Sequence, residues 1–466
     1  MNFKQLLLKF IYYLGFSLIF ALAIRIQIAR SAYSPPIIQP AEVVPAITTE
    51  QISGDINAAV QRFEESQVAQ FSTYLGIEFF GKISSLEQTC QTLDELSQAT
   101  DTKPALIYVV SHLDKLELLL ILPSCQRVRR VIPEANRQVI DKVAQDFRTQ
   151  IINPIADNSR NSSSAQQLYR WIVTPLEAEL QANQIKSLVF CMDVGLRSIP
   201  LAALYNGQQF LIEQYSVALI PSFSLTDTRY QRLENLRLLA MGISKSTQKE
   251  RPLPAVVVEV SNLTSQLWQG KALLDEDSTV NNFKAANRQE RFGIIHMATH
   301  AEFQPGRASN SYVQFWDEKL RLEQLRQLSL ELEWEAPPKI EMLVLSACRS
   351  ALGDAQAELG FTGLAVQAGV KSALGSLWYV SDESTMALMA QFYQQLKTAK
   401  TRVEALRQAQ LAMLKGEVRI QGGQLRLLVE GQEQWILLPA ELNLQDDLRL
   451  SHPYYWSAFT MIGNWN

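Results

Sequence analysis

Two segments of the chain carry side chains that could act together as a nucleophile and its base. The apolar run MLVLSAC ends on Cys348, and RSALGD then breaks the run. The segment FGIIHMATH contains His296 and His300 and precedes Cys348 by about the length of one helix with its connections. A thiol is a strong nucleophile only as the thiolate, which a neighbouring histidine can generate. The two segments therefore suggest a Cys-His dyad.

Each of these residues also has an ordinary structural interpretation. Cys348 taken alone favours a buried thiol, because free cysteine is among the most buried residue types. His296 directly follows an apolar stretch, so we expect it to pack within a strand. His300 is expected just beyond the end of that strand and is followed by the small Ala301. His300 is therefore the better candidate for a general base that solvent and substrate can reach.

Other chemistries fit the histidine segment less well. The H-x-x-x-H spacing occurs in zinc proteases, but Met297 stands where their H-E-x-x-H helix has glutamate, and the segment favours a strand. A serine hydrolase would need a G-x-S-x-G elbow, which the sequence lacks. Walker A and G-x-G-x-x-G sequences are also missing. We therefore expect neither a metal nor a cofactor.

The elements that must position these residues alternate between strands and helices from Lys103 onward. PALIYVVSHLDKLELLLILPS is typical of two strands joined by a tight turn at HLDK. Six further apolar runs are rich in β-forming residues and are separated by helical segments: SLVFCMD, FLIEQYSVALIPS, RLLAMGIS, FGIIHMATH, MLVLSAC and KSALGSLWYV. This alternation predicts an α/β protein with a mostly parallel sheet covered by helices on both faces. Reactive groups in such sheets lie at the carboxyl ends of strands, where HMATH and SAC both fall.

Composition narrows the class of protein. The chain has 466 residues, a formal net charge of −4 and 47% hydrophobic residues, which suits a globular protein of two or three domains. The near-neutral balance gives little support for nucleic-acid binding. The cysteines form no C-x-x-C pair and are scattered, so we expect neither a structural zinc site nor a disulfide framework. They are Cys90, Cys125, Cys191 and Cys348.

The N-terminal residues 1–33 predict a signal peptide or a membrane anchor. Lys4 and Lys9 precede an apolar stretch that ends before Arg25. An A-x-A sequence at Ala21 favours cleavage, whereas Arg25 and the basic residue soon after it favour an uncleaved anchor. A buried core helix is the ordinary alternative. Residues 34–50 are expected to be a proline-rich linker, and residues 51–100 to be helical.

Five sequence blocks, in order, resemble the CHAT domain, a caspase-like (clan CD) cysteine peptidase domain often coupled to TPR repeats. The resemblance spans roughly residues 104–465 and rests on the following blocks: MDVGLRSIPLAALYNGQQFLIEQYSVALIPS, HMATHAEF, LVLSACRSALGD, GFTGLAVQAGVKSALGSLWYVSDEST and HPYYWSAFTMIG. It implies a three-layer α/β/α sandwich, and relatives built from two caspase-like halves suggest the same division here. Residues 101–270 would form the non-catalytic half and residues 271–466 the catalytic half.

The resemblance also implies roles for individual residues. His300 would be the general base and Cys348 the nucleophile, with backbone N–H groups of Ala301 and Cys348 holding the oxyanion. Caspases have glycine where this chain has Ala301, so the site requires an ordinary backbone conformation there. Ser346 stands where relatives that cleave after basic residues have aspartate, and Asp382 is a family-typical acid near another strand end. Both are candidates for lining the substrate pocket, and Asp382 alternatively caps the helix that it begins.

These inferences predict an exported or membrane-anchored caspase-like cysteine endopeptidase that acts on protein or peptide substrates. The membrane contact would be made by the N-terminal segment. The alternative function is a catalytically inactive CHAT module that binds or regulates partners. The sequence contains no TPR array, so a regulatory protein of TPR or other type would have to be a separate chain.

Overall fold

The computed structural model describes residues 56–79, 83–154, 162–336, 339–350, 354–429, 432–442, 444 and 447–466, with the backbone alone at 347–350 and 429. The described residues belong to one compact unit, Thr49–Asn466. The expected anchor (1–33) and linker (34–50) lie outside them. No helix in the described part of the chain is long and apolar enough to cross a membrane.

Two helices precede the sheet, as the sequence predicts. Helix α2 (Ile56–Leu75) buries its apolar face and ends at Gly76, whose φ of 64° is the left-handed conformation that glycine adopts readily. Helix α3 (Leu86–Thr100) begins with a capping box in which Ser85 and Gln88 satisfy each other's backbone N–H groups.

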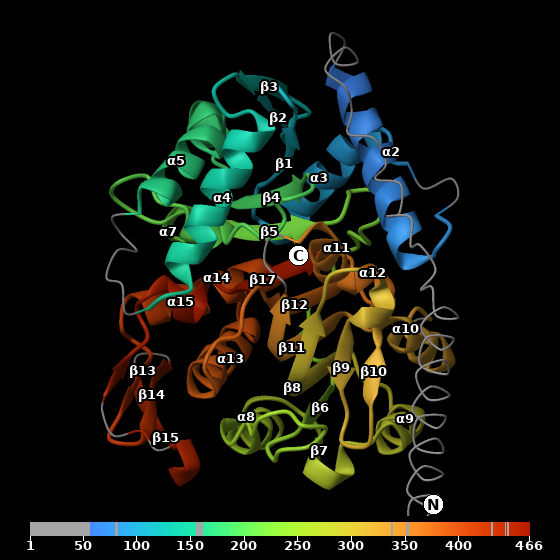
Figure 1. Cartoon of the computed structure of the whole chain (residues 1–466), viewed down its shortest axis with the longest axis vertical. Coiled ribbons are helices and arrows are strands. Elements are labelled where there is room, and N and C mark those ends of the chain that lie inside the picture. Colours follow the sequence, from blue (N-terminus) through green and yellow to red (C-terminus); the bar gives the residue numbers. More distant parts are fainter. Residues whose placement is uncertain are drawn as a thin grey trace, which may run out of the picture. The chain divides into compact units, whose positions relative to one another are not determined.

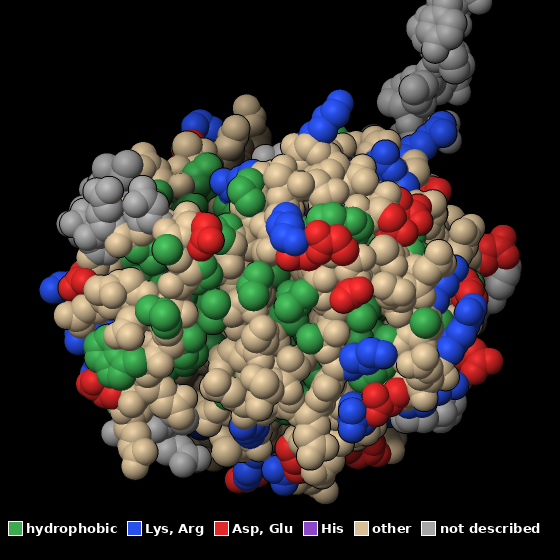
Figure 2. Space-filling view, turned by 90° about the horizontal axis from the view of Figure 1, so that it is seen from below, with side chains coloured by type: hydrophobic (Ala, Val, Ile, Leu, Met, Phe, Trp, Pro, Cys, Tyr) green, Lys and Arg blue, Asp and Glu red, His purple; other side chains and the backbone are tan. Residues whose placement is uncertain are grey.

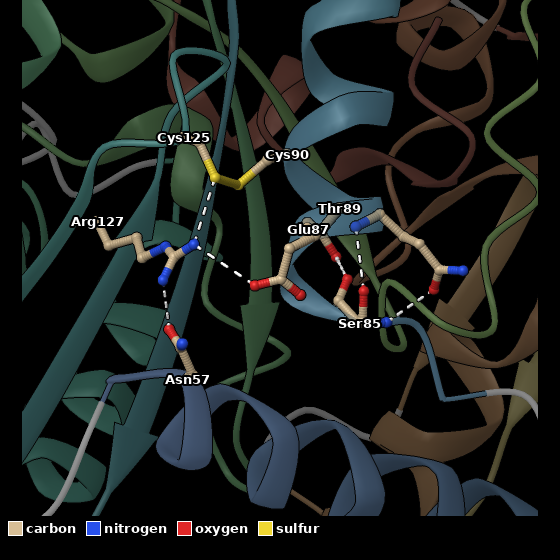
Figure 3. The surroundings of a disulfide bond; sticks show 8 residues. Asn57, Ser85, Glu87, Thr89, Cys90, Cys125 and Arg127 are labelled. Atoms are coloured by element: carbon tan, nitrogen blue, oxygen red, sulfur yellow. Dashed lines mark hydrogen bonds and ion pairs between the residues drawn. A yellow bond between two sulfur atoms is a disulfide. The ribbon is translucent and has the colours of Figure 1, made fainter.

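A disulfide bond fastens α3 to the sheet, contrary to the sequence expectation. Cys90 in α3 is bonded to Cys125, which lies in the turn between the second and third strands (Figure 3). Arg127 lies beside the bond and donates hydrogen bonds to Cys125 Sγ and to Asn57 Oδ1 of α2. Scattered cysteines were a poor guide here, because the fold brings together residues that are far apart in sequence.

A mixed sheet of 13 strands forms the centre of the described unit (Figure 1). Its strands are β1 (Pro104–Ser111), β2 (Leu116–Ile121), β3 (Arg127–Ile132), β4 (Ser187–Met192), β5 (Ser216–Ile220), β6 (Leu238–Gly242), β7 (Gly270–Leu274), β8 (Ile294–Phe303), β9 (Tyr312–Gln314), β10 (Lys319–Arg321), β11 (Met342–Ser350), β12 (Ser372–Ser376) and β17 (Phe459–Gly463). The main path runs β10-β9-β8-β11-β12-β17-β5-β4-β1-β2-β3, and β6 pairs with β8 and β7.

Most strands of the sheet fall into two parallel blocks, and β2, β3, β9 and β10 pair antiparallel beside them. Strands β7, β6, β8, β11 and β12 are parallel neighbours, and so are β17, β5, β4 and β1. The two blocks meet where β12 and β17 run antiparallel, so the C-terminal strand β17 completes the block that holds the earlier strands. The expected boundary at residue 270 separates β6 from β8, which are hydrogen-bonded neighbours, and the division into halves stays a prediction.

Helices cover both faces of the sheet, and a small second sheet follows them. The helices are α4 (Arg137–Ile151), α5 (Ser163–Ile172), α6 (Glu177–Ala182), α7 (Leu211–Gln214), α8 (Ala255–Asn262), α9 (Val280–Gln289), α10 (Leu322–Glu331), α11 (Ala355–Thr362), α12 (Leu364–Ala368), α13 (Asp382–Leu396), α14 (Arg402–Leu414) and α15 (Pro453–Trp456). In the block that contains β8 and β11, α8 and α13 pack against each other and against these strands, with α9 and α10 on the other side (Figure 1). The second sheet contains β13 (Arg419–Gln421), β14 (Gln424–Val429), β15 (Gln432–Leu437) and β16 (Leu448–Arg449).

Charged side chains of both signs occur on one face of the molecule. Figure 2 shows basic and acidic side chains interspersed between apolar ones on this face. Neighbouring charges of opposite sign largely cancel at a distance, so this face presents no extended field of a single sign.

Candidate active site

The candidate dyad lies on adjacent parallel strands. Strand β8 carries His300 and strand β11 carries Cys348; His300 pairs with Ala347, and Cys348 pairs with Ala301. Parallel strands lie about 4.8 Å apart and rise about 3.3 Å per residue, which puts the Cα atoms of His300 and Cys348 about 6 Å apart. The structure thus brings together the two residues that the sequence singled out.

Both strands continue further than the sequence indicated. His300 was expected beyond the end of its strand, but β8 runs on to Phe303, and β11 continues past Cys348 to Ser350. The extension of β8 has a tertiary cause, since Ala301 and Glu302 pair with β9. Both residues therefore occupy the last part of a paired strand rather than a loop.

A bulge adjusts how the two strands meet. Leu345 pairs with Met297, but Ala347 pairs with His300, so β8 contains one residue more than β11 over this interval. Without the extra residue, continued pairing would place His300 directly opposite Cys348. Bulges bend a strand and redirect its side chains, and they recur beside active sites.

One hydrogen bond determines which nitrogen of His300 is available as a base. His300 Nε2 lies 2.9 Å from the backbone carbonyl oxygen of Arg251. A carbonyl oxygen can only accept, so Nε2 carries the proton and the lone pair of the neutral ring is on Nδ1. Burial lowers the pKa of His300 below its ordinary value. The ring is therefore neutral near pH 7, as a general base must be.

Two side chains that the sequence reasoning did not identify surround His300. The ring of Tyr379 is stacked against the imidazole, with centroids 6.3 Å apart and an interplanar angle of 23°. The guanidinium carbon of Arg251 lies 3.5 Å from the centre of the same tyrosine ring, within the range of a cation–π interaction. The available sequence signal was RPLP at Arg251, a stiff stretch between β6 and α8.

The candidate nucleophile and the candidate oxyanion donors lie on β11 and β8. The side chain of Cys348 lies outside the described residues, and its backbone position is given by the strand pairing. Ala301 is extended within β8, paired with Val313 and Cys348, so its φ is negative as an alanine requires. Cys191 is the free cysteine of the described part of the chain, and burial raises the pKa of its thiol well above the ordinary value. Cys191 is therefore a poor nucleophile.

The two candidates for the substrate pocket differ in burial, since Ser346 is buried and Asp382 is partly exposed. Ser346 is 1% exposed and lies at the bulge, so its side chain is not open to a substrate. Asp382 begins α13 but does not cap it, since Ser381 occupies the N-cap position. Asp382 Oδ2 instead accepts the backbone N–H of Ala255, 2.6 Å away, at the start of α8. Burial raises the pKa of Asp382 to about 7.

The other histidines have structural partners. His296 is buried, as expected, with Nε2 2.8 Å from Glu259 and Nδ1 3.2 Å from Tyr393 Oη. His112 is bonded to Glu117 in the interior, and His452 accepts the N–H of Tyr454 at the start of α15. The H-x-x-x-H sequence lies on a strand rather than a helix. No cluster of three or more His, Cys, Asp or Glu side chains suited to a metal occurs among the residues described.

A comparison with known protein families identifies the family of this chain. The sequence pattern of the CHAT domain matches residues 162–464, a segment that includes both His300 and Cys348. The chain belongs to the CHAT domain family. This confirms the resemblance seen in the five sequence blocks, and the mostly parallel, helix-covered sheet confirms the fold class expected of a CHAT domain. A comparison with curated protein sequences gives no match.

Solved structures resemble this CHAT domain at low sequence identity. Two structures of the Saccharomyces cerevisiae separase–securin complex match with 9% and 8% identity and TM-scores of 0.45 and 0.46. Each match covers 88% of this chain but 34% of the other, so this chain spans about a third of that length. The complex of Porphyromonas gingivalis RgpB pro- and mature domains matches with 11% identity and a TM-score of 0.37, covering 70% of this chain and 76% of that one.

Proposed function

We propose that the chain is a caspase-like cysteine endopeptidase that hydrolyses peptide bonds through Cys348 and His300. The strand pairing carries the proposal, because it places Cys348 one residue beyond the partner of His300 on the adjacent strand. The orientation of His300 by the Arg251 carbonyl supports it further.

The proposed reaction follows from these positions. His300 Nδ1 takes the thiol proton of Cys348, and the sulfur attacks the scissile carbonyl carbon to form a tetrahedral intermediate. Backbone N–H groups of Ala301 and Cys348 are the candidates for stabilising its oxyanion. The leaving amine receives the proton from His300, and a thioester to Cys348 remains. Water, deprotonated by His300, then hydrolyses the thioester and regenerates the thiol.

We also propose that the protein is exported or anchored through residues 1–33 and works in an oxidising compartment. The Cys90–Cys125 disulfide supports this, since such bonds persist in oxidising environments and are rare in the cytosol. Sequencing the first residues of the mature chain, purified from its cells, separates a cleaved signal from an anchor. Recovery of the protein in the soluble cytosolic fraction with both thiols reduced would contradict the proposal.

A labelling experiment tests the dyad. The 466-residue chain is incubated with an electrophilic peptide probe for caspase-like cysteines, alongside Cys348→Ala and His300→Ala. Wild type should be labelled at Cys348, Cys348→Ala not at all, and His300→Ala more slowly by a factor of about 10²–10⁴. Equal labelling of wild type and Cys348→Ala would rule out Cys348 as the nucleophile. A folded wild type that is not labelled and cleaves no peptide would favour the inactive CHAT module.

A further inference from the structure

The segment that presents its carbonyl to His300 is unusually stiff. Residues 251–255 read RPLPA, so the φ angles of Pro252 and Pro254 are fixed and Arg251 is restricted to extended conformations. Leu253 between them is 1% exposed, and its N–H donates to the carbonyl of Ser244 at 2.8 Å. The segment therefore connects Ala255 to the Arg251 carbonyl through the anchored Leu253, with little conformational freedom between them.

Asp382 holds one end of this segment. The first residue of α8 is Ala255, and Pro254 at the N-cap offers no side-chain hydrogen bond. The carboxylate of Asp382, from the start of α13, accepts the Ala255 N–H instead. A negative charge at a helix N-terminus interacts favourably with the exposed N–H groups and with the helix dipole.

Tyr379 holds the other end and also contacts the candidate base. It lies in the connection just before Asp382, the first residue of α13, and the Arg251 guanidinium lies over its ring. His300 is stacked on that ring and bonded to the carbonyl of the same Arg251. The connection before α13 and the segment before α8 thus meet at two points, and His300 contacts both segments.

A buried hydrogen bond holds α8 against β8. Glu259 of α8 is hydrogen-bonded to His296 of β8, the two side chains being 1% and 0% exposed. Tyr393 of α13 contacts the other ring nitrogen of His296 at 3.2 Å. Helix α8 is therefore attached both to the strand that carries His300 and to the helix that carries Asp382, so a shift at its N-terminus cannot be taken up by sliding of the whole helix.

We propose that Asp382 is a positioning residue for His300, acting through Ala255 and the RPLPA segment to hold the Arg251 carbonyl against Nε2. This inference rests on the proposed function of His300 as the general base. It assigns the family-typical acid to the orientation of the base rather than to a substrate pocket. Without the carboxylate, the segment is released at Ala255, and the imidazole loses its fixed tautomer.

The state of the His300 ring tests the proposal without relying on peptidase activity. Nitrogen-15 NMR of the ring nitrogens is recorded for the 466-residue chain, with His300 assigned by its absence in His300→Ala. The wild type should show the Nε2–H tautomer near pH 7.5, and Asp382→Ala should show a mixture of both tautomers. Labelling of Cys348 by the peptide probe should slow about 100-fold in Asp382→Ala, as expected for a displaced base.

Two variants serve as controls. Glu383→Ala removes the neighbouring acid in the same helical turn but leaves the bond from Asp382 to Ala255, so tautomer and labelling should match the wild type. Asp382→Asn keeps the size and one accepting oxygen without the charge, and should slow labelling about 5-fold. It also provides the comparison if Asp382→Ala does not fold.

The tautomer of His300 in Asp382→Ala decides whether Asp382 positions the ring. A folded Asp382→Ala with the wild-type tautomer overturns the positioning role, whether or not labelling slows. A mixed tautomer in Asp382→Ala supports the role, even if no form of the protein is labelled at Cys348. In that last case the proposed peptidase function fails, while the effect of Asp382 on His300 stands.

Discussion

His300 donates its Nε2 proton to the backbone carbonyl of Arg251, 2.9 Å away, which leaves Nδ1 as the basic nitrogen. A backbone carbonyl cannot ionise, so it orients the ring without adding a charge that would titrate with it. Burial of the ring lowers the pKa of His300, and the hydrogen bond that orients the ring opposes part of that shift. Both effects can be measured.

We expect His300 to titrate below the ordinary histidine value of 6.5. Burial lowers its pKa because the charged imidazolium loses more hydration than the neutral ring. The basic form should thus remain in the majority as the pH falls to 6.5. Nitrogen-15 NMR titration of Cys348→Ala, which removes the influence of a thiolate, measures the midpoint. A midpoint above 6.5 would contradict the prediction.

Asp382 should make the stability of the protein depend on pH between about 4 and 7. Its pKa is raised from 3.8 to about 7 by burial, so the folded state binds a proton in this range that the unfolded state has lost. Stability is therefore greatest below pH 4 as far as this group is concerned, and it falls as the pH rises through 7. Asp382→Asn removes this dependence.

The midpoint of urea unfolding at pH 5 and pH 8 measures this effect. From pH 5 to pH 8 the wild type should lose at most a few kcal/mol of stability through deprotonation of Asp382. Asp382→Asn should not show this loss. Glu383→Ala is the matched control, because Glu383 does not make the hydrogen bond to Ala255 and the variant keeps Asp382. A difference between wild type and Asp382→Asn that stays constant with pH would show that Asp382 is not protonated in the folded protein near neutrality.

Much of the order of strands and helices could be predicted, because apolar runs and helical segments alternate along the chain. The short strands β3, β7, β9 and β10 and the ends of β8 and β11 could not be predicted. Nothing in HMATHAEF itself shows that β8 continues past His300. The continuation depends on β9, which pairs with Ala301 and Glu302 and lies beyond a loop. The bulge opposite Ser346 depends likewise on two strands at once.

The side chains that surround His300 could not be predicted from the local sequence either. Arg251 and Tyr379 are far apart in sequence and meet only because α8 and α13 pack together. Asp382 was recognisable as an acid at a helix start, yet the helix that it caps is α8, not its own α13. Residue type and spacing pointed to His300 and Cys348 as the candidate pair, whereas the side chains around His300 are set by packing between distant segments.

Loss of the Cys90–Cys125 disulfide should destabilise the protein by about 2–4 kcal/mol, because the bond closes a loop with a sequence separation of 35 and restricts the unfolded chain. Urea unfolding of Cys90→Ser/Cys125→Ser against oxidised wild type measures the loss. Wild type in reductant should unfold at the same urea concentration as the double variant. Thiol counting on unreduced, denatured wild type should give two free thiols of the four cysteines, and four would contradict the bond.

A buried cluster of charged side chains holds the starts of β11 and β12. Glu341, directly before β11, is bonded to Arg402 of α14 at 2.7 Å and to Lys371, before β12, at 2.6 Å. Arg402 and Glu341 are each 1% exposed, and Arg402 also donates to Ser372 Oγ. These contacts fix the starts of β11 and β12 relative to α14, on which the register at Cys348 depends.

Arg402→Met should therefore destabilise the protein by about 3–5 kcal/mol, because it leaves the buried carboxylate of Glu341 with one cation instead of two. Lys400→Met is the matched control, since its partner Asp101 is 86% exposed and surface pairs contribute about 0–1 kcal/mol. Urea unfolding of both variants against wild type measures the difference. Equal losses in the two variants would mean that the Glu341 cluster is hydrated and does not hold the strands, whereas a large loss confined to Arg402→Met supports its role beneath β11 and β12.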